Sequence, residues 1–111
     1  MFVILLRYTK PLTTIDRLMP AHVAFLEECY RAGVFLASGR RVPRDGGVIL
    51  ARADSREDLE EVLRHDPFVV EDAAEVEIVE FRSSIHHPAL APFADPRTRV
   101  ARAVPPWGGA D

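Results

Sequence analysis

The chain has 111 residues, a formal net charge of −3 and a hydrophobic content of 48%. This length suits one folded domain with a single core, and the slightly acidic balance gives no electrostatic reason to expect nucleic-acid binding. The single cysteine, Cys29, excludes an intrachain disulfide and fits a reducing compartment, so we expect a cytoplasmic protein. The apolar run from Phe2 to Leu6 is too short for a membrane span or a signal-peptide core, so we expect no membrane partner.

The first part of the chain predicts a strand followed by an amphipathic helix. Residues 1–8 are apolar at both odd and even positions, so both faces of this strand need cover. After a polar connection, we expect a helix over residues 17–33, because apolar side chains recur there at steps of three and four. Asp16 is its expected N-cap, Pro20 lies in or just after its first turn, and Gly33 ends it.

A histidine interrupts the apolar stripe of this helix. Leu18, His22, Phe25 and Cys29 follow one another at helical spacing, so His22 points toward whatever the helix packs on. An unpaired polar group away from water costs roughly 1–3 kcal/mol, so a buried imidazole needs a partner. Cys29 lies on the same stripe and is expected to be an inert core residue.

The next segment predicts a hairpin and a second helix. Strands over residues 34–38 and 48–53 flank a run of turn residues that includes Asp45-Gly46-Gly47. Ser55 is the expected N-cap of the second helix, and the apolar seam of that helix continues to Asp66.

A last strand follows an irregular connection. Pro67 prevents the second helix from continuing, and residues 68–72 are expected to lack regular structure. Residues 74–81 alternate apolar and acidic side chains and predict a fourth strand. The alternation slips at Val79, where we expect a bulge or burial on both faces.

The composition changes at Ser83. Five of the nine prolines lie between Pro88 and Pro106, and no periodic apolar segment longer than a turn follows. We therefore expect a folded domain over residues 1–82 and a proline-rich, extended C-terminal extension over residues 83–111. Its apolar residues suggest that the extension lies across the domain or across a partner subunit; they are Leu90, Phe93, Val100 and Trp107.

The order of elements predicts an α+β, ferredoxin-like βαββαβ fold, with a four-stranded antiparallel sheet and two helices on one face. In this topology the start of the first helix and the end of the second lie at the same end of the domain. His22 and Asp66 are therefore predicted neighbours. A carboxylate at a helix C-terminus is disfavoured by the macrodipole, and an imidazole hydrogen bond would offset that cost.

The same topology leaves one face of the sheet without helices. Because the first strand needs cover on both faces, a second copy of the sheet is the simplest cover. We therefore expect a homodimer that pairs through the helix-free sheet face.

Several short motifs together resemble the YCII-related (YciI-like) family of the dimeric α+β barrel superfamily. The resemblance covers Phe2 to about Phe81 and rests on Arg17, Pro20-Ala21-His22, Gly33, Ser38-Gly39, Gly46-Gly47 and Asp66-Pro67-Phe68. It implies that His22 and Asp66 line a pocket as the proposed catalytic pair. One branch of the family resembles lyases that remove halide from chlorinated hydroxyquinols, and the fold is shared with muconolactone isomerase-like proteins. The extension from Ser83 departs from the short form of the family.

Each candidate site residue also has a structural interpretation. His22 could be a hydrogen-bonded core histidine, although the expected pairing with Asp66 and the resemblance favour a catalytic dyad. Arg17, one turn before His22, could bind an anionic substrate or could simply be solvated. Ser38 and Tyr8 could offer hydroxyl groups to the pocket or could only end their strands.

Three other groups carry weaker signals. Adjacent His86 and His87, with Asp95, lack the spacing of metal ligands, so we expect neither a metal nor a cofactor. His65 should point about 100° around the helix from Asp66 and is expected at the surface. The arginines of the hairpin are most simply a solvated tip, with guidance of anions as the alternative; they are Arg40, Arg41 and Arg44.

These observations leave three functions open. The first is a small cofactor-independent lyase or isomerase in which His22, oriented by Asp66, is the general base on a small, cyclic or anionic substrate. The second is a non-catalytic dimer that binds a metabolite for regulation. The third is an interaction module that acts through the C-terminal extension.

Overall fold

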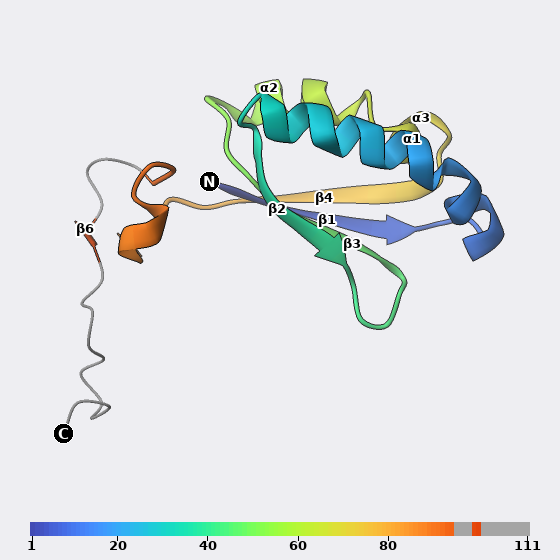
Figure 1. The fold of residues 1–111 in the computed structure, drawn as a ribbon, viewed down its shortest axis with the longest axis horizontal. Coiled ribbons are helices and arrows are strands. Elements are labelled where there is room, and N and C mark those ends of the chain that lie inside the picture. Colours follow the sequence, from blue (N-terminus) through green and yellow to red (C-terminus); the bar gives the residue numbers. More distant parts are fainter. Residues whose placement is uncertain (95–98, 101–111) are drawn as a thin grey trace. The chain divides into compact units, whose positions relative to one another are not determined.

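The computed structural model describes residues 1–94 and 99–100, and the chain divides into two units, Met1–Phe81 and Arg82–Asp111. The first unit contains, in chain order, β1 (Phe2–Tyr8), α1 (Leu12–Arg31), β2 (Phe35–Arg40), β3 (Gly46–Ala51), α2 (Arg56–Leu63), α3 (Pro67–Val70) and β4 (Ala74–Glu80). The strands form an antiparallel sheet in the order β2-β3-β1-β4. The helices cover one face of this sheet (Figure 1). The predicted ferredoxin-like fold is confirmed.

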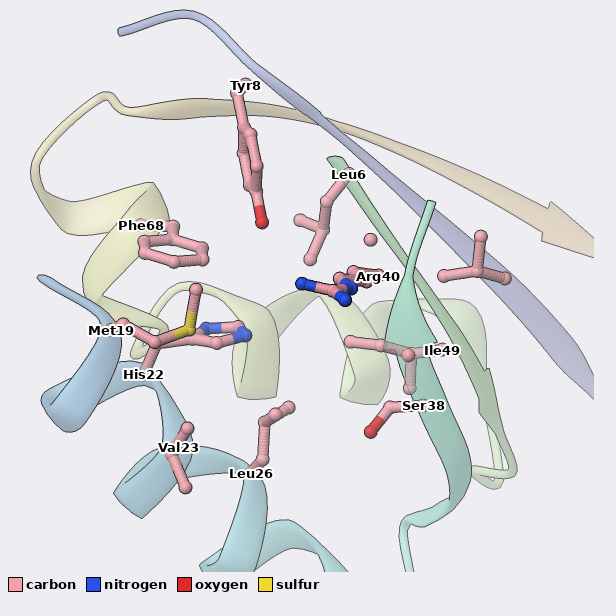
Figure 2. A pocket seen from close by; sticks show the side chains of 13 residues that line it. Leu6, Tyr8, Met19, His22, Val23, Leu26, Ser38, Arg40, Ile49 and Phe68 are labelled. Carbon is pink, nitrogen blue, oxygen red and sulfur yellow. The ribbon is translucent and has the colours of Figure 1, made fainter. Parts of the chain in front are cut away.

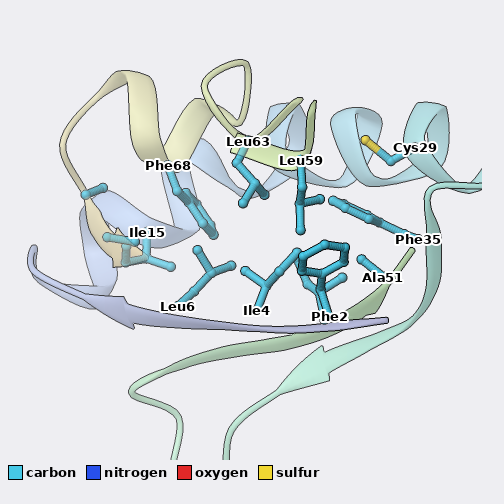
Figure 3. Packing of buried hydrophobic residues seen from close by; sticks show 13 residues of the cluster. Phe2, Ile4, Leu6, Ile15, Cys29, Phe35, Ala51, Leu59, Leu63 and Phe68 are labelled. Atoms are coloured by element: carbon cyan, nitrogen blue, oxygen red, sulfur yellow. The ribbon is translucent and has the colours of Figure 1, made fainter. Parts of the chain in front are cut away.

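The core lies between the sheet and the helices. Alternate residues of β1 point into it: Phe2, Ile4 and Leu6 are all buried. Side chains from each helix meet them from the other side, including Ile15 of α1, Leu59 of α2 and Phe68 of α3 (Figure 3). This core fixes the helices against the sheet and so fixes the ends of the elements that build the site.

Helix α1 begins earlier than predicted. It starts at Leu12, with Pro11 as its N-cap residue, so Pro20 lies inside the helix rather than near its start. The extra turn is stabilised by Ile15, which is completely buried. The predicted cap, Asp16, instead forms an ion pair with Arg44 of the hairpin.

The hairpin strands are also longer than predicted on the turn side. The two glycines expected in the turn begin β3, where Gly46 pairs with Arg7 and Gly47 with Leu6. A Cβ atom on Gly46 would lie 1.8 Å from the backbone oxygen of Leu6, so this position needs glycine for the strands to approach. On the other side of the hairpin, β2 continues to Arg40.

Two further expectations about the first unit are corrected. The connection after Pro67 is not irregular, because residues 67–70 form the one-turn helix α3. Of the two alternatives at Val79, the bulge is excluded: β4 pairs with β1 in continuous register, with Val79 opposite Val3, and the bulge lies in β2 between Phe35 and Ala37. The N-cap expected at Ser55 is confirmed, since its side chain accepts a hydrogen bond from the Asp58 N–H.

The second unit is not simply extended. It contains β5 (Ile85–His86), the 3₁₀ helix η1 (Pro88–Leu90) and β6 (Arg99–Val100), and β5 pairs with β6 in parallel. His87 caps η1, because its Nδ1 accepts a hydrogen bond from the Ala89 N–H at 3.0 Å. Trp107 and Asp95, and the side chain of Val100, lie outside the described residues. In the described part of the chain, no helix has the length and apolar character needed to cross a membrane.

Candidate active site

His22 and Asp66 form a buried hydrogen-bonded pair. The distance between His22 Nδ1 and Asp66 Oδ1 is 2.8 Å, and the two residues are 6% and 0% exposed. An ionised carboxylate can only accept hydrogen bonds, so the imidazole Nδ1–H is the donor. The predicted proximity of these residues, 44 positions apart in the sequence, is confirmed.

Asp66 owes its position to α3 and not to α2. Helix α2 ends at Leu63, and Asp66 is the N-cap of α3, where its Oδ1 also accepts a hydrogen bond from the Phe68 N–H at 2.9 Å. A carboxylate is favoured at a helix N-terminus, so the sequence-based expectation of an unfavourable helix dipole was wrong. The second oxygen, Oδ2, is buried and has no hydrogen-bond partner among the described residues.

An aromatic stack holds the imidazole from a second direction. The rings of His22 and Phe68 lie almost parallel, with centroids 4.0 Å apart and planes 13° apart. Phe68 also meets the Tyr8 ring edge-on at 5.7 Å. Sequence reasoning missed both this stack and the short helix α3 that carries Phe68. The Asp66-Pro67 pair was a signal for the start of that helix, because Asp is a preferred N-cap and Pro a preferred first helical residue.

A pocket of about 140 Å³ lies beside this pair (Figure 2). Its lining is mostly apolar and consists of Leu6, Tyr8, Met19, His22, Val23, Leu26, Ser38, Gly39, Arg40, Gly47, Val48, Ile49 and Phe68. Because Nδ1 of His22 is bonded to Asp66, the ring nitrogen left for the pocket is Nε2. Val23 is 41% exposed and Arg40 is exposed, so the pocket reaches the protein surface.

Two of the three other residues predicted for the site line the pocket, and the third does not. Tyr8 and Ser38 line the pocket, whereas Arg17 is exposed and is not part of its lining. The Ser38 hydroxyl is hydrogen-bonded to the Tyr30 hydroxyl at 2.5 Å. Arg40 was not predicted as a site residue because β2 was expected to end at Ser38. Alternation along a longer strand would have placed Arg40 on the same face as Ser38.

The Tyr8 hydroxyl stays protonated near neutral pH. Burial raises the pKa of Tyr8 above its ordinary value, and the positive charge of Arg44 opposes this rise only in part. Arg44 contacts Tyr8 and also pairs with Asp16, so it ties the hairpin to the first turns of α1 at the edge of the pocket. Tyr8 is therefore available as a neutral hydrogen-bonding group.

The described residues do not bring together three histidine, cysteine or carboxylate side chains that could hold a metal ion. His87 uses its Nδ1 to cap η1, and His65 is a surface residue near Glu61, as expected from its position on the helix.

Comparisons with known proteins agree with this architecture. The chain is similar in structure to 5-chloro-2-hydroxyhydroquinone dehydrochlorinase from Burkholderia phenoliruptrix AC1100, solved in complex with 2,5-dihydroxybenzoquinone. The TM-score is 0.62 and the identity 17%, over 74% of this chain and 94% of the dehydrochlorinase chain. At this identity the likeness establishes a shared fold. No curated protein matches the sequence.

The family is identified by sequence. The model of the YCII-related domain matches residues 1–82, which include all seven helices and strands of the first unit and every residue that lines the pocket. The chain therefore belongs to the YCII-related domain family.

Proposed function

We propose that the protein is a small enzyme with lyase or isomerase activity, in which His22 is the general base and Asp66 orients it. The observation that carries the proposal is the 2.8 Å hydrogen bond between His22 Nδ1 and Asp66 Oδ1, which leaves Nε2 for the pocket. The similar dehydrochlorinase supports an elimination or a related proton-transfer reaction, because loss of hydrogen chloride requires a base to accept the proton.

The proposed reaction begins with proton transfer from a hydroxyl or an acidic carbon of the substrate to Nε2 of His22. The resulting imidazolium is stabilised by the Asp66 carboxylate, which is held in place by the Phe68 N–H. The electron pair left on the substrate then expels a leaving group with its bonding electrons, or the proton returns at another atom. The first outcome is lyase chemistry, and the second is isomerase chemistry.

We also propose that the protein is a homodimer, with the helix-free face of the sheet as its interface. Val3 is paired with Leu50 on one side and with Val79 on the other, so these side chains share a face with Leu5. Val79 is 42% exposed in the single chain, although it belongs to an apolar cluster. Burial of this cluster against a second copy would remove that apolar area from water.

Hydrogen–deuterium exchange of candidate substrates tests the general base without knowledge of the leaving group. Hydroxylated and chlorinated hydroquinones are incubated with the protein in D₂O, and carbon-bound deuterium and released chloride are measured. We expect wild-type turnover, a loss of roughly 10²–10⁴-fold in His22→Gln, and a smaller loss in Asp66→Asn. His65→Gln is the matched control, because His65 is an exposed histidine away from the pocket.

Full activity in His22→Gln would overturn the proposed catalytic role. A different result would identify a non-catalytic binding module: 2,5-dihydroxybenzoquinone raises the melting temperature, but no exchange or product appears with any compound.

A further inference from the structure

Arg40 is a cation at the edge of the pocket, and no carboxylate of the described residues pairs with it. It is the last residue of β2, and it lines the pocket on the same strand face as Ser38. The other two arginines of the hairpin are paired, Arg41 with Asp45 at 3.3 Å and Arg44 with Asp16. Within residues 1–94, the Arg40 guanidinium has no such ion pair.

The Arg40 side chain extends into the space between two other polar groups of the pocket. Figure 2 shows its guanidinium between the Tyr8 hydroxyl and the imidazole of His22. Its positive charge also acts on the Tyr8 hydroxyl and lowers the pKa of that group against the larger rise caused by burial. Polar groups from β1, α1 and β2 thus converge on one part of the pocket.

The remaining walls cannot neutralise this charge. Leu6, Met19, Leu26 and Phe68 contribute apolar surface. A guanidinium beside apolar walls attracts an anion that enters the pocket, and its N–H groups form charge-assisted hydrogen bonds with that anion. Its planar donors match the two oxygens of a carboxylate or the oxygen of a phenolate.

The pocket has room for about one ring. Its volume is about 140 Å³, and an engineered apolar cavity of about 150 Å³ in another protein binds benzene. We propose that Arg40 binds the anionic oxygen of a small planar substrate, either a ring carboxylate or a phenolate, and so makes the pocket selective for anions. The inference rests on the proposed function only in taking this pocket as the substrate site.

This role also fits the chemistry proposed for His22. When Nε2 removes a proton, negative charge develops on the substrate, and the positive charge of Arg40 in the same pocket stabilises it. Arg40 is thereby both a binding residue and a determinant of specificity. Arg17, the arginine that the sequence suggested for anion binding, lies outside the pocket lining.

Binding of simple aromatic anions tests the inference without knowledge of the substrate. Benzoate and 4-nitrophenolate are titrated into the full-length protein by calorimetry at mildly alkaline pH, where an ordinary histidine is neutral. Benzamide, which has the shape of benzoate but no charge, is the ligand control. The protein variants are Arg40→Gln, Arg40→Lys and Arg41→Gln, the last removing a neighbouring charge that does not line the pocket.

We expect wild type to bind at least one of the two anions more tightly than benzamide. Arg40→Gln should weaken anion binding by at least about tenfold, the value of one charge-assisted hydrogen bond. Arg40→Lys should retain part of it, and Arg41→Gln should bind as wild type does. Preference for benzoate would identify a carboxylate substrate, and preference for 4-nitrophenolate a phenolate.

Three results would overturn the inference: no binding of either anion to wild type, binding of neither anion more tightly than benzamide, or equal weakening by Arg40→Gln and Arg41→Gln. Failure of the proposed catalysis gives a different pattern. Arg40-dependent anion binding would then persist, while His22→Gln would leave turnover unchanged or no compound would react.

Discussion

The imidazole of His22 stacks on the ring of Phe68, and the backbone N–H of Phe68 binds the carboxylate oxygen that holds His22. One residue of α3 therefore fixes the plane of the base and the position of the residue that orients it. The orientation of the imidazole depends on how the short segment after α2 is folded.

Removal of the Asp66 carboxylate should destabilise the protein as well as free the imidazole. Asp66→Ala leaves the Phe68 N–H and His22 Nδ1–H as buried donors without an acceptor, so we expect the free energy of unfolding to fall by at least about 1–3 kcal/mol. Urea denaturation measures this change. Asp54→Ala, at an exposed position, should stay within about 0.5 kcal/mol of wild type. Equal stability of the two variants would contradict the structural role of Asp66.

The stack itself can be tested at Phe68. Phe68→Ala removes a ring that is 1% exposed and that contacts both His22 and Tyr8, so we expect a loss of about 3–5 kcal/mol in the free energy of unfolding. Phe81→Ala removes a ring that is 39% exposed and should cost clearly less. NMR of the His22 ring protons adds a direct readout, since the upfield shift caused by stacking should disappear only in Phe68→Ala.

Close approach of the hairpin to β1 should depend on one glycine and not on its neighbour. A Cβ at Gly46 would lie 1.8 Å from the Leu6 backbone oxygen, whereas one at Gly47 would have its nearest contact at 3.4 Å. We expect Gly46→Ala to lower the free energy of unfolding by about 1–3 kcal/mol or more, and Gly47→Ala to change it little. Thermal denaturation compares them, and equal melting temperatures would contradict the close approach.

The proposed dimer predicts that a charge at Val79 separates the subunits. Val79→Asp would place a carboxylate in the apolar cluster near Glu77, so we expect a dimeric wild type and a monomeric variant. Light scattering after size exclusion measures the mass of each. Val42→Asp, at a residue that is 95% exposed on the hairpin, should leave the dimer intact. A monomeric wild type would refute the interface.

Cys29 should be unreactive in the folded protein. Burial, followed by the nearby charge of Asp66, raises the pKa of its thiol from 9.0 to about 11. We expect a disulfide reagent at mildly alkaline pH to label the native protein slowly and the urea-unfolded protein rapidly.

The raised pKa of Cys29 also determines how the free energy of unfolding changes with pH. The folded thiol binds its proton more tightly than the unfolded one, so its contribution is complete below about pH 9 and is lost as the pH rises toward about 11. Cys29→Ala should therefore lose less stability than wild type across this interval. An identical decline in both proteins would show that another group is responsible.

The sequence predicted the fold well because each core element carried its own periodic signal. The alternate buried residues of β1 and the apolar stripe of α1 were visible as patterns, and their order was enough to place His22 near Asp66. The apolar residues on both faces of the first strand, together with the topology, also suggested that the helix-free face of the sheet needs cover.

The errors came where a contact distant in sequence decided the local structure. Pro20 suggested a later start for α1, but burial of Ile15 stabilises an additional turn that no local signal required. The glycines that suggested a turn instead begin β3, and Gly46 is needed there for the close approach to β1. Arg40 entered the site only because β2 runs two residues further than predicted.

The pocket takes its lining from β1, α1, β2, β3 and α3, so its walls come from segments that are far apart in the sequence. A molecule that binds there can bind only to a chain in which β1, β2 and β3 have paired and α1 and α3 are packed on them. Mass action then makes such a ligand a stabiliser of the complete domain, and local opening of any one of these elements must compete with its binding. The small pocket therefore links occupancy by a substrate to protection of the entire fold against unfolding.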